Sequence, residues 1–216
     1  MSLQRQTLAA IAAELNRTNQ HHGSETLIDL PLGPALYLTD TGVHPDPVQI
    51  PDRLPATSVV ILRDYDHPER EVLAARLAEM CQRRRLYFFV GGDAALAHRV
   101  GAHGVHLPER LIDRLPRLRQ TYQTFLFTAS CHSARALLRA ERLGADAVLL
   151  SPVFPTHSHA ETFSRPERTL GACRFRTLCR RSNIPVYALG GLNVDTAPRL
   201  RQSTLAGLAS IRGYEG

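Results

Sequence analysis

Hydroxyl and imidazole side chains gather in one loop in the second half of the chain. The loop follows an unbroken apolar run, Ala147 to Leu150, which is typical of a strand buried on both faces. Thr156, Ser158 and His159 come soon after it. Groups of this kind bind anions or carry protons, and α/β enzymes place them at the carboxyl ends of parallel strands. We therefore predict a binding or catalytic loop at this point.

A second group of residues is suited to binding an anion. Gly190 and Gly191 follow one apolar run, and Ile211, Arg212 and Gly213 end another. Glycine lets backbone N–H groups approach a phosphate, and arginine binds phosphate through two N–H groups at once. Barrel enzymes commonly bind phosphate after their last two strands. The pattern predicts a phosphate site, and the alternative is that the glycines only allow tight turns.

One histidine lies within an apolar run and another comes directly after one, so we expect different roles for them. His132 comes directly after such a run, and its unperturbed pKa near neutrality suits a proton carrier. The alternative for His132 is a purely structural hydrogen bond. His106 lies between Val105 and Leu107, so we predict that it is a hydrogen-bonded residue of the core.

The elements that must position these residues are eight short apolar runs, most of them separated by helical patterns. The expected strands are 35–38, 58–62, 86–90, 104–107, 124–130, 147–150, 185–189 and 205–211. The expected helices between them are 71–84, 94–100, 110–119, 134–143, 170–181 and 195–201, with Ser133 and Asp195 as caps and a break at Pro116 in the third of them. This order predicts an α/β TIM (β/α)8 barrel, with a doubly wound open sheet as the alternative.

The two ends of the chain depart from a regular barrel. Apolar residues at helical spacing predict an amphipathic helix over residues 2–19, with Ser2 as its cap, and no helix follows the last strand. We expect an N-terminal helix and linker over 1–33 and the barrel over 34–216. The helix either fills the vacant place in the outer ring or plugs the bottom of the barrel. The pair His21-His22 after it is a poor candidate for a metal site, because the side chains of adjacent residues on a helix point in different directions.

Composition limits the class of protein. The chain has 216 residues, of which 44% are hydrophobic and 21% charged, and this fits one globular domain. Its net charge of +6 favours anionic ligands such as phosphates or nucleic acid, but the arginines are spread over helices as solvated faces are. The four cysteines form no CxxC pair, and no apolar run is long enough to span a bilayer. We expect a cytoplasmic protein with free thiols.

Several of these segments together carry a family resemblance. They are Leu36-Tyr-Leu-Thr-Asp40, Val60-Ile-Leu-Arg63, Gly104-Val-His-Leu107, Ser130-Cys-His-Ser133, the long segment from Gly144 to Thr156, and Ala188-Leu-Gly-Gly191. With them the chain, from about residue 35 to 213, resembles the family of thiamine-phosphate synthase and its relative, the TenI-type thiazole tautomerase. Membership would imply a TIM barrel.

Departures from the family pattern bear on the reaction. The synthase joins a pyrimidine diphosphate to a thiazole phosphate and holds magnesium on two aspartates. Its Asn-Asp-Asp motif is Gly91-Gly92-Asp93 here, and its second metal aspartate falls on Leu111, with Asp113 two residues further on. In the family a glutamine and a lysine flank the second-strand arginine, and here these positions are Ile61 and Tyr65. The family lysine of the sixth-strand loop is replaced by His159, and a serine of the last phosphate motif is replaced by Arg212. Diphosphate departure depends on magnesium and cations, so these changes argue against the synthase reaction.

The resemblance therefore favours a TenI-like proton transfer, which needs no metal and no other cofactor. It implies a catalytic role for His132. The place of His159 in the sixth-strand loop makes it a candidate for a second proton carrier or a phosphate contact. The residues expected to bind the substrate or its phosphate are Arg63, Thr156, Ser158, Gly190, Gly191, Ile211, Arg212 and Gly213. The expected partner is a small phosphorylated thiazole, without nucleic acid or membrane, and a homodimer is a further expectation. One alternative is a synthase whose metal site is rebuilt on Asp93, Asp40 or Asp64. Another is a non-catalytic barrel that binds a phosphorylated ligand.

Overall fold

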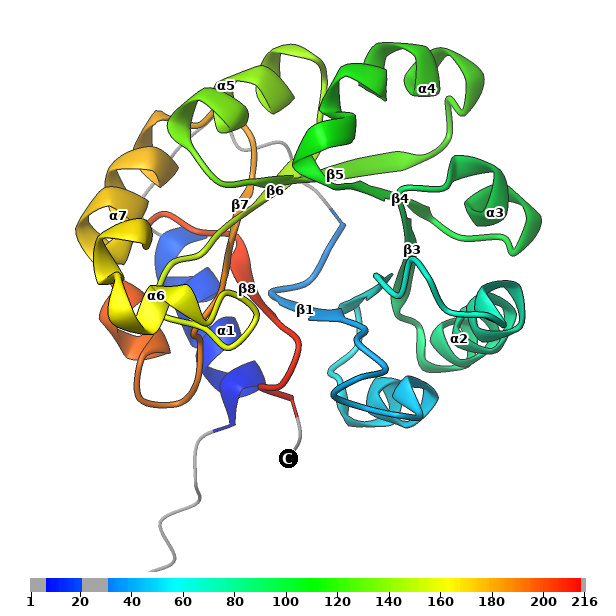
Figure 1. Cartoon of the computed structure of the whole chain (residues 1–216), viewed down its shortest axis with the longest axis horizontal. Helices are drawn as coiled ribbons and strands as arrows, with labels where there is room; N and C mark the ends of the chain where they lie inside the picture. The colour runs from blue at the N-terminus through cyan, green and yellow to red at the C-terminus, as the bar shows by residue number, and fades with distance from the viewer. Residues whose placement is uncertain (1–6, 21–30, 215–216) are drawn as a thin grey trace, which may run out of the picture.

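The computed structural model describes residues 7–20 and 31–214, in which eight parallel strands form a closed barrel in chain order (Figure 1). The strands are β1 Ala35–Leu38, β2 Val59–Leu62, β3 Tyr87–Gly91, β4 Gly104–Leu107, β5 Leu126–Cys131, β6 Ala147–Leu150, β7 Val186–Leu189 and β8 Gly207–Ser210. β1 pairs with β8 as well as with β2, with Leu36 opposite Ala209. This pairing closes the sheet, so the predicted barrel is confirmed and the open-sheet alternative is wrong.

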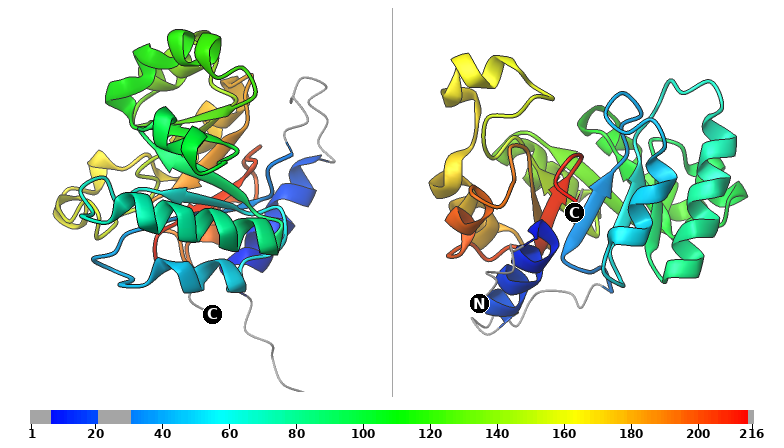
Figure 2. Two further views of the ribbon diagram at one scale, coloured as in Figure 1. Left: turned by 90° about the vertical axis from the view of Figure 1, so that its right-hand side faces the viewer. Right: turned by 90° about the horizontal axis from the view of Figure 1, so that it is seen from below.

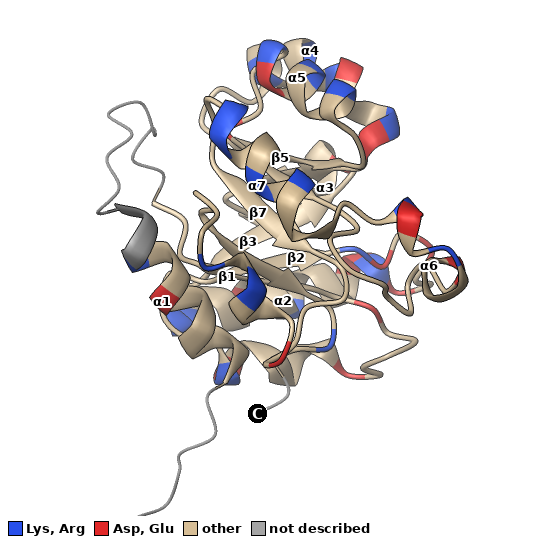
Figure 3. Ribbon diagram, turned by 90° about the vertical axis from the view of Figure 1, so that its left-hand side faces the viewer, with Lys and Arg blue, Asp and Glu red and all other residues tan. Residues whose placement is uncertain are grey.

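The helices lie outside the ring of strands (Figure 1). They are α1 Leu8–Gln20, α2 Arg70–Arg84, α3 Ala94–Arg99, α4 Leu115–Thr121, α5 Ala134–Arg142, α6 Glu161–Ser164 and α7 Gly171–Arg181. Four 3-10 helices complete the set, namely η1 Pro47–Arg53, η2 Glu109–Arg114, η3 Pro166–Arg168 and η4 Ala197–Leu200. Within the described residues no helix is long and apolar enough to cross a membrane. The cationic side chains are all arginine, and they are spread over several helices rather than gathered in one patch (Figure 3).

One expected helix is broken as predicted, and another is shorter than expected. The break expected at Pro116 is confirmed, since η2 ends at Arg114 and α4 begins at Leu115, with Pro116 in the first turn of α4, where proline needs no hydrogen-bond partner. The helix expected after Asp195 is only the short η4, and Asp195 does not cap it. Asn193 Oδ1 instead accepts hydrogen bonds from the main-chain N–H groups of Asp195 and Thr196, both at 2.9 Å. The cap at Ser133 is confirmed, since its side chain accepts from Ala136 N.

The inside of the barrel combines large and very small residues. The large side chains of Phe89 and Tyr187 are fully buried there, together with branched residues of β1, β2 and β6. The same layer contains Gly104 and Gly207, where an added Cβ would overlap the main-chain oxygens of Leu126 and Pro34. Strands can approach closely at these glycines, and the rings fill the remaining space as dense packing requires.

His106 also points into the barrel and is 1% exposed. Its Nδ1 lies 2.9 Å from Thr128 Oγ1 and its Nε2 lies 2.8 Å from Ser130 Oγ, so both ring nitrogens are hydrogen-bonded, as predicted from its apolar neighbours. Burial, with a further contribution from the charge of Arg63, lowers the pKa of His106 to about 3. The imidazole is therefore neutral in the folded protein at neutral pH.

α1 takes the place in the outer ring that the helix after β8 would occupy. Leu8, Ile11 and Leu15 are at most 2% exposed, and the helix packs against β8, η4 and β1. Asn16 Nδ2 donates to Ala206 O at 2.7 Å, directly before β8. Figure 2 shows α1 in dark blue alongside β8 in red. Of the two placements expected for this helix, filling the ring is the one observed, and the predicted cap Ser2 and the pair His21-His22 lie outside the described residues.

We expect Ile11→Ala to lower the free energy of unfolding by about 2–5 kcal/mol, because it removes a fully buried side chain from the contact between α1 and the barrel. The measurement is urea denaturation followed by circular dichroism. Arg17→Ala, on the exposed face of the same helix, should change stability by about 0.5 kcal/mol or less. Equal effects of the two substitutions would contradict the docking of α1.

The buried neutral His106 predicts a dependence of stability on pH. Between the unfolded pKa near 6.5 and the folded value of about 3, the unfolded chain binds a proton that the folded chain does not, so stability falls as pH falls. From pH 7 to pH 5 this one group should cost about 2 kcal/mol. Urea denaturation at both pH values should show a smaller loss in His106→Gln than in the wild type. The same substitution at the exposed His98 should leave the wild-type loss unchanged, and an unchanged loss in His106→Gln would contradict the prediction.

Candidate functional site

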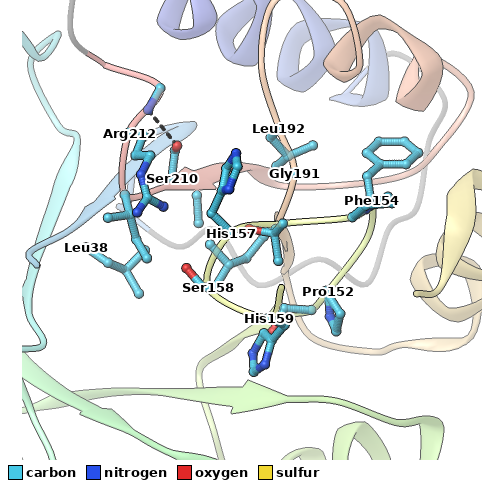
Figure 4. Close-up of a pocket in the computed structure, with 18 of the residues that line it drawn as sticks. Leu38, Pro152, Phe154, His157, Ser158, His159, Gly191, Leu192, Ser210 and Arg212 are labelled. Carbon is cyan, nitrogen blue, oxygen red and sulfur yellow. Dashed lines mark hydrogen bonds between the residues drawn. The ribbon is translucent and has the colours of Figure 1, made fainter. Parts of the chain in front are cut away.

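A cavity of about 710 Å³ opens at the carboxyl ends of the strands. It collects the residues that the sequence patterns and the resemblance mark as a site, from positions 63 to 213 of the chain. Its lining includes Arg63, His132, Thr156, Ser158, His159, Gly190, Gly191, Ile211, Arg212 and Gly213. Figure 4 shows Arg212, His157, Ser158 and His159 around one opening. The structure thus brings all ten predicted site residues to one cavity, and their individual roles stay predictions.

The main-chain and side-chain contacts of His132 orient its ring. Its main-chain N–H donates to Glu109 Oε2 at 2.7 Å, and its Nδ1 lies 3.0 Å from Ser151 O and 3.2 Å from Ser151 Oγ. A carbonyl oxygen only accepts, so a proton on Nδ1 satisfies this contact. Nε2 then carries the lone pair, and it has no hydrogen-bond partner among the described residues. In this tautomer, His132 can accept a proton at Nε2.

The loop after β6 is organised by one buried hydroxyl. Thr162 is 1% exposed, and its Oγ1 donates to His159 O at 2.6 Å and accepts from Thr156 N at 2.9 Å. His159 N donates in turn to Thr156 O at 3.0 Å. These bonds fold the segment 156–162 into a compact turn, because they satisfy main-chain groups that a loop would otherwise leave unpaired.

The same turn brings two histidines, His157 and His159, to the cavity that His132 also lines. The rings of His159 and His132 lie edge to face with centroids 6.2 Å apart, although they come from the loops after β6 and β5. His159 Nδ1 lies 3.8 Å from Glu161 Oε1, while His157 packs on the exposed ring of Phe163 at 5.0 Å. The structure therefore places the two predicted proton carriers side by side, but not in direct hydrogen-bond contact.

Gly190 and Gly191 have a conformational reason to be glycine. Both have positive φ, +96° and +66°. A Cβ at Gly190 would lie 3.0 Å from Pro152 Cα, and a Cβ at Gly191 would overlap Pro155 O. The turn is thus held by close contact with the segment after β6, which agrees with the tight-turn alternative. The same close contact brings the turn to the cavity wall, where the phosphate prediction needs it.

The residues after β8 contribute one unpaired cation. Arg212 is exposed, and among the described residues no hydrogen-bond or ion-pair partner is found for its guanidinium. Gly213 N already donates to Ser210 Oγ at 2.8 Å, and Ile211 O contacts His44 Nε2 at 3.2 Å. A phosphate at this end would therefore meet the Arg212 side chain first, and contact with Gly213 N–H would require displacing Ser210.

The other two arginines of the lining have partners. Arg63 Nη2 lies 2.5 Å from Asp40 Oδ2, and Arg199 covers the ring of Phe154 with its Cζ 4.7 Å from the centroid. Glu109 is the acidic residue of the lining within the described chain. Because the charge of Arg63 is offset by Asp40, the Arg212 side of the cavity is the better place for an anion.

The magnesium site implied by the family resemblance does not fit these residues. Gly91, Gly92 and Leu111 stand at positions that would need side-chain oxygens. Within residues 7–20 and 31–214, no group of three or more His, Cys, Asp or Glu side chains could hold a metal ion.

The aspartates that could rebuild such a site are engaged elsewhere. Asp93 caps α3 by accepting from Leu96 N at 2.9 Å, and Asp113 pairs with Arg139. Burial opposes the ionisation of Asp64, but hydrogen bonds from Thr39 and Thr41 outweigh it and lower its pKa. Asp40 pairs with Arg63, so each carboxylate has its own protein partner and none points with another at a shared position.

Some cavity residues escape the sequence patterns. Glu109, Asn193, Thr196 and Arg199 line the cavity although no motif marks them. Glu109 comes two residues after β4, and this position alone could have identified it, because the carboxyl ends of all eight strands share one rim. Arg199 lies inside η4 and reaches the cavity only through the fold of the preceding turn.

Comparisons with known proteins agree with this geometry. The family model described as thiamine monophosphate synthase matches residues 49–214. A thiamine-phosphate synthase of Thioalkalivibrio sulfidiphilus is 35% identical over 136 residues, which cover 62% of this chain and 62% of that protein. The thiamine-phosphate synthase of Pyrococcus furiosus is 27% identical over 183 residues, 83% of this chain and 85% of that protein. The solved thiamine phosphate pyrophosphorylase from Pyrococcus furiosus superposes with a TM-score of 0.70 at 25% identity, covering 84% of this chain and 86% of that one. The chain belongs to the thiamine monophosphate synthase family.

Proposed function

We propose that this protein binds a small phosphorylated thiazole and catalyses a proton transfer on it, as a thiazole tautomerase-like isomerase. The observation that supports this most directly is the arrangement of His132. Its Nδ1 contacts Ser151, its Nε2 is left to accept a proton, and Arg212 lines the same cavity without a hydrogen-bond or ion-pair partner among residues 7–20 and 31–214. A base and an anion-binding group in one cavity are the minimum that such a reaction requires.

The phosphate would bind at the Arg212 side of the cavity, beside the turn Gly190-Gly191. A guanidinium offers a phosphate two parallel N–H donors, and these charge-assisted bonds are stronger than neutral ones. The ring of the substrate would then extend toward His132, with Thr156 and Ser158 as further hydroxyl contacts. Thr162 acts indirectly in this arrangement, because it holds the turn that carries these groups.

The reaction moves one proton and consumes no second reactant. His132 Nε2 accepts a proton from one position of the non-aromatic ring, and the proton returns to another position, which leaves the ring aromatic and His132 neutral. His159, whose ring lies edge to face with that of His132, is the alternative donor for the second transfer, and in that case solvent takes the proton from His132 and returns one to His159. None of these steps needs a metal ion.

The names of the relatives favour a second candidate, the coupling reaction of a thiamine-phosphate synthase. It would require a place for magnesium and for a diphosphate leaving group, and the described carboxylates supply none. A homodimer and a cytoplasmic location remain expectations from the sequence.

We expect His132→Ala to lower kcat for aromatisation of a thiazole carboxylate phosphate by about 10²–10⁴-fold, because it removes the proton acceptor. Arg212→Ala should instead weaken binding of the same compound by about 10–100-fold, because it removes the charged phosphate contact. The measurements are absorbance of the aromatic product and isothermal titration calorimetry. Arg181→Ala, an exposed arginine at the end of α7, is the matched control and should change neither value.

Full activity of His132→Ala would remove the assigned role of His132. Magnesium-dependent formation of thiamine phosphate by the wild-type protein would establish the coupling reaction instead. Binding of the thiazole phosphate that depends on Arg212, with no turnover of any tested thiazole, would identify a non-catalytic binding protein.

A further inference from the structure

The cavity does not extend to the carboxyl end of β3. Seven strands or the segments that follow them contribute lining residues, but within the described chain β3 and residues 91–93 contribute none. On this side the lining is formed by Tyr65, which follows β2 and is 38% exposed. The cavity therefore ends at the ring of Tyr65, although the barrel continues beyond it.

Tyr65 lies directly on the two glycines that follow the core of β3. A Cβ at Gly91 would come within 3.1 Å of Tyr65 Cε1 and 3.3 Å of its hydroxyl, and a Cβ at Gly92 would lie 3.4 Å from Cε1. The space that side chains would occupy at these two positions is thus filled by the tyrosine ring. A Cβ at Gly91 would also lie only 2.6 Å from Leu62 O, so glycine at this position allows both the main chain of β2 and the tyrosine ring to lie close to it.

Guanidinium groups surround the same ring. Arg70 Cζ lies 5.7 Å and Arg110 Cζ 5.9 Å from its centroid, both within the range of cation–π attraction. Arg70 is also fixed by donating to Gly91 O at 2.6 Å and to Asp64 O at 2.9 Å. Arg110 is exposed and has no carboxylate partner in the part of the chain that the structure describes. Tyr65 therefore separates a group of cations from the cavity.

The phenol of Tyr65 is neutral at neutral pH. Burial raises its pKa, and the nearby charges of Arg63, Arg110 and Arg70 act in the opposite direction without cancelling that effect. A neutral aromatic ring offers an anionic ligand one hydroxyl donor, whereas the arginines behind it would offer several charged donors.

We infer that Tyr65 determines the substrate class of this site by closing its β3 side against a second, diphosphate-bearing substrate. The cavity then holds one phosphorylated ring at the Arg212 side, and the cations beside Tyr65 stabilise the tyrosine rather than a ligand. This inference rests on the proposed one-substrate reaction. It identifies Tyr65 as the residue that excludes the diphosphate-bearing substrate of the coupling reaction.

The test measures binding of inorganic pyrophosphate, without magnesium, by isothermal titration calorimetry. An Arg212→Ala background removes the phosphate contact at the other side of the cavity. In that background Tyr65→Ala should bind pyrophosphate at least about tenfold more tightly than the parent, because it opens the cavity toward Arg110, whereas Arg70 stays engaged with Asp64 O, Gly91 O and Asp93. Tyr65→Phe, which keeps the ring, should show no gain. Adding Arg110→Ala to Tyr65→Ala should reduce the gain.

Tyr65→Leu, which removes the ring without adding a charge, provides a second opening of the same wall if Tyr65→Ala is poorly folded, with folding checked by circular dichroism. A folded Tyr65→Ala or Tyr65→Leu variant that binds pyrophosphate no better than the parent would overturn the inference. So would a Tyr65→Phe variant with the same gain as Tyr65→Ala. Neither readout requires turnover, so the inference can fail while the tautomerase proposal stands. Loss of the tautomerase proposal would likewise leave the pyrophosphate measurement interpretable.

Discussion

The close contact between the turn after β7 and the segment after β6 shapes the whole site. Val153 N donates to Leu189 O at 2.9 Å, and Phe154 N donates to Gly190 O at 3.1 Å, so the two loops are joined by main-chain hydrogen bonds. Only glycine at 190 and 191 allows this approach, because a Cβ at either position would meet the facing backbone. The segment after β6 therefore leaves the barrel in a defined direction, and it carries the hydroxyl and imidazole groups of the cavity with it.

The electrostatics of the rim follow from which charges have partners. Asp40 offsets Arg63, Asp93 caps a helix, and Asp64 is held by Thr39 and Thr41. These carboxylates are paired with groups of the protein, so they do not create the concentrated negative charge that a divalent cation needs. Arg212 is left as a cation with room for an anion beside it. This distribution of charge is the basis for proposing a small phosphorylated ligand rather than a metal–diphosphate complex.

Much of the fold could be predicted because its signals are local. Runs such as Ala147–Leu150 have the length and composition of buried strands. All eight expected strands are present, and each strand end lies within two residues of its expected position. Errors arose where the local signal was ambiguous. Asp195 resembles a helix cap, but Asn193 already accepts the hydrogen bonds of the main-chain N–H groups in that turn.

The barrel and the set of rim residues could be read from the sequence, because strand periodicity and the position after each strand are properties of neighbouring residues. The family followed from motifs such as the segment from Gly144 to Thr156. The contacts that these residues make with one another are visible in the folded chain alone. The tautomer of His132 depends on Ser151, nineteen residues away, and the edge of the cavity depends on Tyr65 lying over Gly91 and Gly92. Such contacts join segments that are distant in the chain, so the packing of the loops sets them and no local pattern records them.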